Sequence, residues 1–191
     1  MNKKPYLDYY KKHNVSPVIN NLDWDLHMIQ RKSLYDRLGV IDGCVRDKNI
    51  LEFGPGNGAN ALYTLSLLPN KYVLVDANPK GLINCNNNLE KFYPNSNWTL
   101  VDSMIENYQS NSKFDIVICE CLLPHQNNPA EMARHTASFL NSGGVFIATC
   151  HDMVSTASET LRSLPGWILV KDSNMKFDEK VKKLSHFYHD H

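Results

Sequence analysis

The chain has 191 residues, of which 42% are hydrophobic and 21% charged, and this composition is typical of one soluble domain with a substantial core. Twenty lysine and arginine residues match twenty aspartate and glutamate residues, so the formal net charge is zero. Because no segment concentrates positive charge, a nucleic-acid backbone is excluded as an expected partner, and no apolar run approaches the roughly 18 residues of a membrane span.

The chain begins with a segment that we predict to be a helical cap, residues 1–48, ahead of a core formed by residues 49–191. In the stretch KPYLDYYKKHN (residues 4–14), a helix would carry four ring side chains on overlapping faces: Tyr6, Tyr9, Tyr10 and His13. Such rings would either close over a pocket, where they can hold a cationic group or a sugar, or anchor the helix to the sheet.

A second helix is expected over Asn21–Gly39, ending at the glycine. Its apolar positions are Leu22, Leu26, Ile29, Leu34 and Leu38. Arg31 and Lys32 on the same helix suit either an anionic group or a solvated face equally well.

From residue 49 onward, short apolar runs alternate with segments of helical pattern, as in a βαβ fold. Strands are expected at Asn49–Phe53, Tyr72–Asp76, Trp98–Val101, Phe114–Cys119 and Val145–Cys150. Helices are expected at Ala59–Leu68, Pro79–Phe92 and Pro129–Leu140, the last closed by a cap and turn at Asn141–Gly144. YVLVD and FDIVIC are apolar on both faces, as strands covered on both sides must be. The pattern predicts an α/β fold: an open, Rossmann-like, mostly parallel sheet with helices on both faces.

The stretch ILEFGPGNG (residues 50–58) places three glycines between a strand and a helix. Gly54, Gly56 and Gly58 leave room for a ligand near free backbone N–H groups and the positive end of the helix. Asp76 ends the next strand, about 20 residues further on, where a carboxylate can accept both hydroxyls of a ribose. Together these features predict a nucleoside site. The alternative is that the glycines only tighten the turn and that Asp76 caps the helix begun at Pro79.

These residues resemble the motifs of the class I S-adenosylmethionine-dependent methyltransferases. ILEFGPGNG is similar to the first motif of that family, YVLVDANP to the second, WTLVDSM to the third and FDIVICECLLPH to the fourth. The resemblance implies S-adenosyl-L-methionine as cofactor, with Asp76 on the ribose, Asp102 on the adenine amino group, and Ser103 and Met104 beside the adenine ring. The remaining implied cofactor-binding residues are Glu52, Gly54, Gly56, Gly58, Ala77 and Glu120.

Three features favour this family over nicotinamide enzymes. Glu52 stands two residues before the first glycine, a helical segment precedes the first strand, and an acid, Asp102, ends the third strand as well as the second. Two alternatives remain open: an NAD(P)-dependent oxidoreductase, and a non-catalytic S-adenosylmethionine-binding domain of a larger protein.

The end of the chain departs from the family pattern, in which a sixth and a seventh strand complete the sheet. GWILVKD (residues 166–172) suits the sixth strand, but residues 177–191 have a helical pattern and nothing follows them. We therefore expect either that the final strand is missing or that the chain is a fragment.

Two histidines directly follow expected strand ends and are candidate catalytic bases. His125 and His151 have an ordinary pKa of about 6.5, so either can take a proton from an acceptor hydroxyl near neutral pH. The alternative is a loop histidine bonded to the backbone. A metal site from these two residues and Asp152 has only generic spacing, and His186, His189 and His191 suit an interrupted helix, so no metal is expected.

The acceptor is expected to be a small metabolite or a sugar-linked molecule, methylated on oxygen or nitrogen. The (N/D)-P-P-(Y/F) motif of methyltransferases that act on amino groups of bases or glutamine is absent, since CECLLPH stands in its place. The N-terminal stretch is also loosely similar to methyltransferases of bacterial surface-polysaccharide gene clusters. Five cysteines without paired or zinc-type spacing, and an N-terminus without an apolar signal segment, predict a cytoplasmic protein. The sequence leaves the oligomeric state open.

Overall fold

The structure is a computed structural model that describes residues 5–14, 23–40 and 42–149, with residues 168, 171, 174–176, 179–180 and 182–183. The chain divides into two compact units, Met1–Cys150 and His151–His191, and the first holds the parallel sheet and its helices. The expected sixth strand and the helical pattern that follows it lie, apart from these few residues, outside the described part of the chain.

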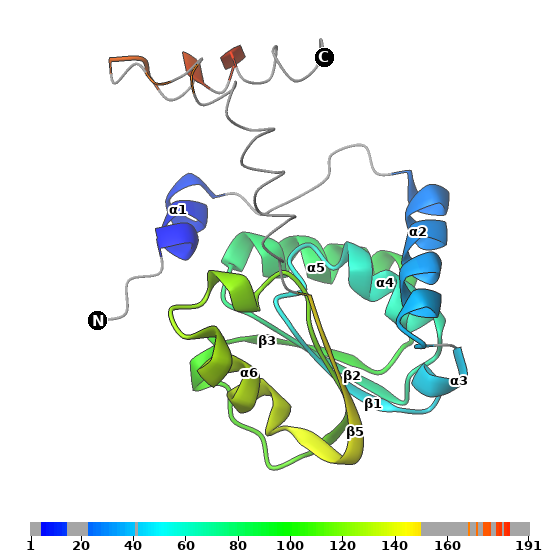
Figure 1. Cartoon of the computed structure of the whole chain (residues 1–191). Coiled ribbons are helices and arrows are strands. Elements are labelled where there is room, and N and C mark those ends of the chain that lie inside the picture. Colours follow the sequence, from blue (N-terminus) through cyan, green and yellow to red (C-terminus); the bar gives the residue numbers. More distant parts are fainter. Residues whose placement is uncertain are drawn as a thin grey trace. The chain divides into compact units, whose positions relative to one another are not determined.

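A parallel sheet in the order β3-β2-β1-β4-β5 forms the centre of the first unit (Figure 1). Its strands are β1 (Asn49–Phe53), β2 (Lys71–Asp76), β3 (Trp98–Asp102), β4 (Phe114–Cys119) and β5 (Leu140–Ala148). The predicted bounds of β1 and β4 are confirmed, and those of β2 and β3 differ by one residue. The expected open, parallel α/β architecture is thereby confirmed.

Helices cover both faces of this sheet, α4 and α5 on one face and α6 on the other (Figure 1). The described helices are α1 (Pro5–His13), α2 (Trp24–Arg37), α3 (Asp42–Val45), α4 (Ala59–Ser66), α5 (Pro79–Phe92) and α6 (Pro129–Ala137), with 3₁₀ turns η1 (Ile105–Asn107) and η2 (Leu123–His125). The bounds of α5 match the prediction because Asn78 caps the helix by accepting from the Lys80 N–H, and Pro79 occupies the first helical turn.

Alternating side chains of the strands divide the core into two clusters. On one face, Ile50, Tyr72 and Leu74 pack beneath helices α4 and α5 and beside Tyr35 of α2. On the other face, Leu51, Phe53 and Val75 belong to the cluster against which α6 packs. Since both faces are covered, the strands are apolar throughout, and the one acid inside β1, Glu52, is forced into the first cluster's face of the sheet.

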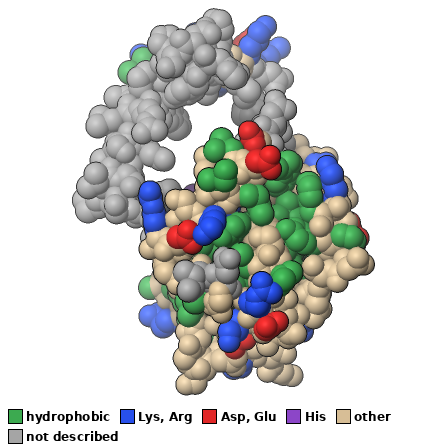
Figure 2. Space-filling model, turned by 90° about the vertical axis from the view of Figure 1, so that its right-hand side faces the viewer, with side chains coloured by type: hydrophobic (Ala, Val, Ile, Leu, Met, Phe, Trp, Pro, Cys, Tyr) green, Lys and Arg blue, Asp and Glu red, His purple; other side chains and the backbone are tan. Residues whose placement is uncertain are grey.

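The apolar positions named for the helix of α2 do not form its buried face. Leu26, Ile29 and Leu38 are at least half exposed, and the buried residues are His27, Arg31 and Tyr35. Figure 2, which views the side on which α2 lies in Figure 1, shows hydrophobic side chains gathered at this surface among charged ones. The helix turns a polar stripe inward because it faces polar groups near the ends of the strands.

The predicted turn at Asn141–Gly144 is also wrong, since these residues lie inside β5. Helix α6 ends at Ala137 instead of Leu140, and β5 pairs with β4 first at Phe114↔Leu140 and then at Ile116↔Val145. The shift in register leaves residues 141–144 as a bulge, in which Gly143 adopts a φ of 78°. None of the helices in the described part of the chain is long and apolar enough to cross a membrane.

Candidate active site

The carboxyl ends of four strands bring the predicted cofactor residues to one edge of the sheet. Gly54 follows β1, Asp76 and Asp102 end β2 and β3 as direct partners in the register, and Glu120 follows β4. The chain order reverses between β1 and β4, and open α/β sheets bind ligands in the crevice at such a reversal.

A small cavity of about 50 Å³ opens at this edge. Its lining residues are Leu7, Gly54, Val75, Asp76, Ala77, Ser103, Met104, Ile105 and Leu122. The walls are largely apolar and carry one carboxylate, which is the usual composition of a small-molecule site. Five of the predicted cofactor residues therefore line one space, while the contributions of Leu7 from α1 and Leu122 from the turn after β4 were not predicted.

The three glycines of the loop between β1 and α4 all have positive φ, between 58° and 77°, but their surroundings differ. A Cβ at Gly54 would lie 3.2 Å from Leu122 Cδ2, and a Cβ at Gly56 would meet nothing within 4 Å. At Gly58 it would lie 2.6 Å from Cys85 Sγ, so this glycine makes room for α5. The N–H groups of all three already donate within the protein, to Val75, Asp76 and Pro55 respectively.

Asp76 lines the cavity and holds the loops on either side of it. Its Oδ2 accepts from the Gly56 N–H at 3.0 Å and its Oδ1 from the Asn78 N–H at 2.8 Å. Burial raises the pKa of the carboxyl, and these backbone hydrogen bonds act in the opposite direction. Since the α5 cap is Asn78, Asp76 is not the helix cap that the alternative interpretation required.

Ala77, Ser103 and Met104 lie around Asp76 in the cavity wall. The Ser103 N–H donates to the Asp76 carbonyl at 3.0 Å, which ties the end of β3 to the end of β2. Asp102 itself is exposed and does not belong to the cavity lining. Its predicted contact with an adenine amino group stays a prediction.

Glu52 lies beneath the glycine loop, outside the cavity lining, and is 3% exposed. The Tyr72 hydroxyl donates to its Oε2. Burial raises the pKa of Glu52 from an ordinary 4.5 to about 7, against the lowering effect of the Tyr72 hydrogen bond, and the nearby Glu120 adds to the rise. The sequence singled out Glu52 but not Tyr72, whose aromatic ring suits any buried strand.

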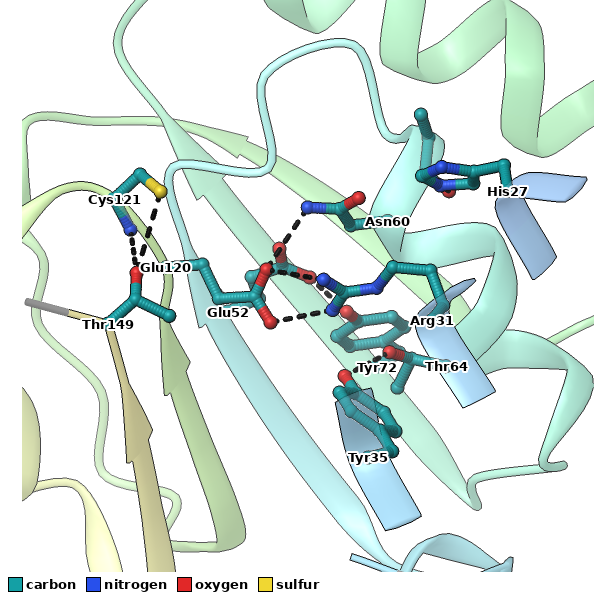
Figure 3. A network of polar contacts seen from close by, with 11 residues as sticks. His27, Arg31, Tyr35, Glu52, Asn60, Thr64, Tyr72, Glu120, Cys121 and Thr149 are labelled. Atoms are coloured by element: carbon teal, nitrogen blue, oxygen red, sulfur yellow. Dashed lines mark hydrogen bonds and ion pairs between the residues drawn. The ribbon is translucent and has the colours of Figure 1, made fainter. Parts of the chain in front are cut away.

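Glu120 forms an ion pair with Arg31 of α2 (Figure 3). The two terminal nitrogens of Arg31 donate to its two oxygens at 3.0 and 2.6 Å, and Asn60 of α4 donates to Oε2 at 3.0 Å. Burial would lower the pKa of Arg31, but the hydrogen bond and the charge of Glu120 outweigh it, so the pKa lies above its ordinary value. Of the two possibilities for Arg31, the structure therefore selects an anionic partner.

Two further residues of the same stripe on α2 make polar contacts (Figure 3). His27 Nε2 lies 3.2 Å from the Ala59 carbonyl, and the Tyr35 hydroxyl lies 2.9 Å from Thr64 Oγ1. Sequence reasoning missed both, although a spacing of four residues between His27, Arg31 and Tyr35 places them on one helix face.

His125 ends the turn η2, three residues after the cavity residue Leu122, and its side chain is exposed. His151 and Asp152 lie outside the described residues, as do His186, His189 and His191. Within the described ranges, no group of three or more His, Cys, Asp and Glu side chains is placed to hold a metal ion.

The expected helix of residues 4–14 is α1, and its Leu7 reaches the cavity. Tyr9 is 41% exposed, and its ring contacts that of His13 at a tilt, with ring centroids 4.5 Å apart. The Tyr6 side chain lies outside the described part. The role of these rings at a pocket stays a prediction.

Comparisons with known proteins agree with this geometry. A family model described as a methyltransferase domain matches residues 45–189. The chain is 24% identical over 173 residues to malonyl-acyl-carrier protein O-methyltransferase 2 of Ilyobacter polytropus, which covers 85% of this chain and 66% of that protein. It is also 24% identical to malonyl-acyl-carrier protein O-methyltransferase 1 of the same organism, over 84% of this chain and 58% of that protein. The chain thus spans less than two thirds of the length of these relatives.

Many solved structures share the fold, including the following two. Magnesium protoporphyrin IX methyltransferase from Synechocystis PCC 6803 with bound SAH has a TM-score of 0.61 at 17% identity, over 83% of this chain and 77% of that chain. A SAM-dependent methyltransferase from Geobacter sulfurreducens in complex with S-adenosyl-L-homocysteine has a TM-score of 0.56 at 14% identity, over 75% of this chain and 54% of that chain. At these identities the likeness establishes the fold alone.

Proposed function

Because the chain belongs to the class I S-adenosylmethionine-dependent methyltransferases, we propose that it transfers the methyl group of S-adenosylmethionine to a small or carrier-linked acceptor. The observation that carries the proposal is the cavity at the ends of β1, β2 and β3, lined by Gly54, Asp76, Ser103 and Met104. When bound, the cofactor supplies an electrophilic methyl group on a positively charged sulfur.

The residues of the cavity fit the nucleoside part of this cofactor. The two oxygens of Asp76 accept the backbone N–H groups of Gly56 and Asn78, and an ionised carboxylate has about four acceptor sites, so acceptor capacity remains for a ribose hydroxyl. Met104, Ile105 and Leu122 give apolar walls that suit an adenine ring. Asp76 places a carboxylate in the cavity lining, and a negative charge there favours a ligand that carries positive charge.

The acceptor is proposed to be oxygen or nitrogen, and oxygen is supported by the names of the two curated relatives. A carboxylate or a free amine attacks without losing a proton first, whereas a hydroxyl needs a base. For a hydroxyl acceptor we propose His125 as that base, because it follows the end of β4 near the cavity, and His151 as the second candidate. A sugar-linked acceptor stays a prediction of the sequence.

A transfer assay with methyl-labelled S-adenosylmethionine tests the proposal. The acceptors are a malonyl thioester on a carrier protein, sugar nucleotides and alkylamines, and label in one of these classes is the expected result. If the acceptor is a hydroxyl, His125→Ala should lower kcat by about 10²–10⁴ with little change in cofactor affinity. Cofactor binding without transfer to any class would favour the alternative of a binding domain within a larger protein.

A further inference from the structure

We infer that Arg31 is a positioning residue, which acts through Glu120 to fix the turn after β4 that carries Leu122 and His125. The inference rests on the proposed function, because this turn forms one wall of the proposed cofactor cavity. Arg31 lies on α2 and does not itself line that cavity.

The pair of Arg31 and Glu120 has the geometry of a rigid clamp. Both side chains are 9% exposed, and the two hydrogen bonds are parallel contacts from one guanidinium to one carboxylate. Paired donors of this kind fix the orientation of a carboxylate as well as its position. Asn60 holds the same carboxylate from α4, so Glu120 is fixed from two helices at once (Figure 3).

The residues that follow Glu120 have little freedom of their own. Cys121 adopts a positive φ of 53°, which residues other than glycine rarely adopt. Its N–H donates to Thr149 Oγ1 at 2.6 Å. Leu122 then packs against Gly54, and its carbonyl accepts from the His125 N–H at 3.1 Å. A displaced Glu120 would therefore move the cavity wall and the histidine together.

The opposite possibility is that Arg31 acts on the ligand directly. Its Nε is buried and has no hydrogen-bond partner among the described residues. The two possibilities differ in one measurable way. If Arg31 acts through Glu120, removing either partner removes the same effect, whereas a direct contact would add to the effect of Glu120.

The test compares Arg31→Met, Glu120→Gln and the double variant. Lys32→Met is the matched control, because Lys32 forms an exposed ion pair with Asp36 on the same helix. S-adenosylhomocysteine is the probe for calorimetry, and the amide signals of Cys121, Leu122 and His125 report the turn by NMR. The Asn49 amide, which donates to Asp115 at the start of β4, reports the far end of the sheet.

We expect each single variant to weaken binding of S-adenosylhomocysteine by about tenfold or more. The loss of affinity in the double variant should not exceed the larger of the two single losses. In the Arg31 and Glu120 variants, the amide signals of the turn should shift and the amide signal of Asn49 should not. In Lys32→Met, none of these signals should shift. Arg31→Lys keeps the charge without the paired donors, so it should show a smaller shift of the same signals and keep the fold.

Two results would overturn the inference. Additive losses in the double variant would show that Arg31 acts on the ligand itself. Unshifted turn signals in Arg31→Met and Arg31→Lys would show that the ion pair serves stability only. If the unmodified protein did not bind S-adenosylhomocysteine, the proposed function would fail, but the NMR comparison of ligand-free variants would still decide whether Arg31 positions the turn.

Discussion

Glu52 is a buried acid beside the polar cluster of Arg31 and Glu120. Its carboxyl is surrounded by Tyr72, which donates to it, and by the charges of Arg31, Glu120 and Asp76. Because Arg31 already binds Glu120, Glu52 has no cation bonded to it among the described residues. Burial then dominates and raises its pKa to about 7.

The pH dependence of stability should reveal this acid. Between its ordinary pKa of 4.5 and about 7, the folded protein keeps a proton that the unfolded chain has released. The contribution of Glu52 to the free energy of unfolding should therefore fall by on the order of 3 kcal/mol at most as pH rises through this window. Above the window this contribution should stay constant. Urea unfolding at pH 5 and pH 8 should show a smaller fall in Glu52→Gln than in the unmodified protein. Equal falls would mean that Glu52 titrates normally.

Asp76 gives the residue-scale test of the nucleoside site. Asp76→Asn keeps the shape of the side chain but removes the charge and half of the acceptors, so affinity for S-adenosylmethionine should drop by roughly 1.5–3 kcal/mol for each charged hydrogen bond lost. Asp115→Asn is the control, because Asp115 also accepts from a backbone N–H, that of Asn49, but near the opposite ends of the strands. If calorimetry finds unchanged affinity in a folded Asp76→Asn variant, Asp76 does not bind the ribose and only holds the neighbouring loops through its backbone contacts.

At this scale the sequence predicts local contacts and misses distant ones. Gly54 and Asp76 were predicted from their places at the ends of strands, because parallel strand ends share an edge, and Ala77, Ser103 and Met104 were implied by the family resemblance. Leu7 and Leu122 are ordinary apolar residues with no chemical signal. The partner of Arg31 is 89 residues away, so only the fold can reveal it.

Among the elements, α4 and α5 pack closely because Gly58 has no side chain. Gly58→Ala would place a Cβ 2.6 Å from Cys85 Sγ at a φ of 77°. Gly143→Ala is a matched control, because its φ is 78° and nothing lies within 4 Å. Backbone strain should cost both variants about 1–3 kcal/mol, and overpacking should cost Gly58→Ala roughly 1–3 kcal/mol more.

Thermal unfolding of the two variants measures this difference. Adding Cys85→Ala to Gly58→Ala should recover part of the extra loss, because it removes the sulfur that the new Cβ meets. Equal losses in Gly58→Ala and Gly143→Ala would show that α4 and α5 can separate without cost.

The elements also show where periodicity fails as evidence. The bounds of α5 were predictable because a capping Asn and a Pro mark its start. The face of α2 was not, because Leu26 and Ile29 are exposed while His27 and Arg31 are buried. Tyr35 of α2 packs in the apolar cluster, but the same face of the helix also places His27 against a carbonyl and Arg31 against a carboxylate, which a hydrophobic pattern does not predict. The bulge in β5 could not be predicted, because the sequence Asn-Ser-Gly-Gly is equally typical of a turn.

For the whole molecule, the order of the strands decides the location of the site. In the strand order β3-β2-β1-β4-β5, the chain order reverses between β1 and β4. Both halves of the sheet contribute to the cavity there, one through Gly54 after β1 and the other through Leu122 after β4. The sequence predicted the alternation of strands and helices, and with it the parallel sheet. The division into a cap of residues 1–48 and a core stays a prediction, and Arg31 and His27 show that α2 is bonded to the core.

The central claim is that this cavity binds S-adenosylmethionine, and the melting temperature with different nucleoside cofactors tests it most directly. A ligand at 100 times its Kd stabilises the folded state by about 2.7 kcal/mol, which corresponds to several degrees for a domain of this size. S-adenosylmethionine and S-adenosylhomocysteine should each raise the melting temperature, and NAD and NADP should leave it unchanged. A rise with NAD or NADP and none with S-adenosylmethionine or S-adenosylhomocysteine would contradict the account.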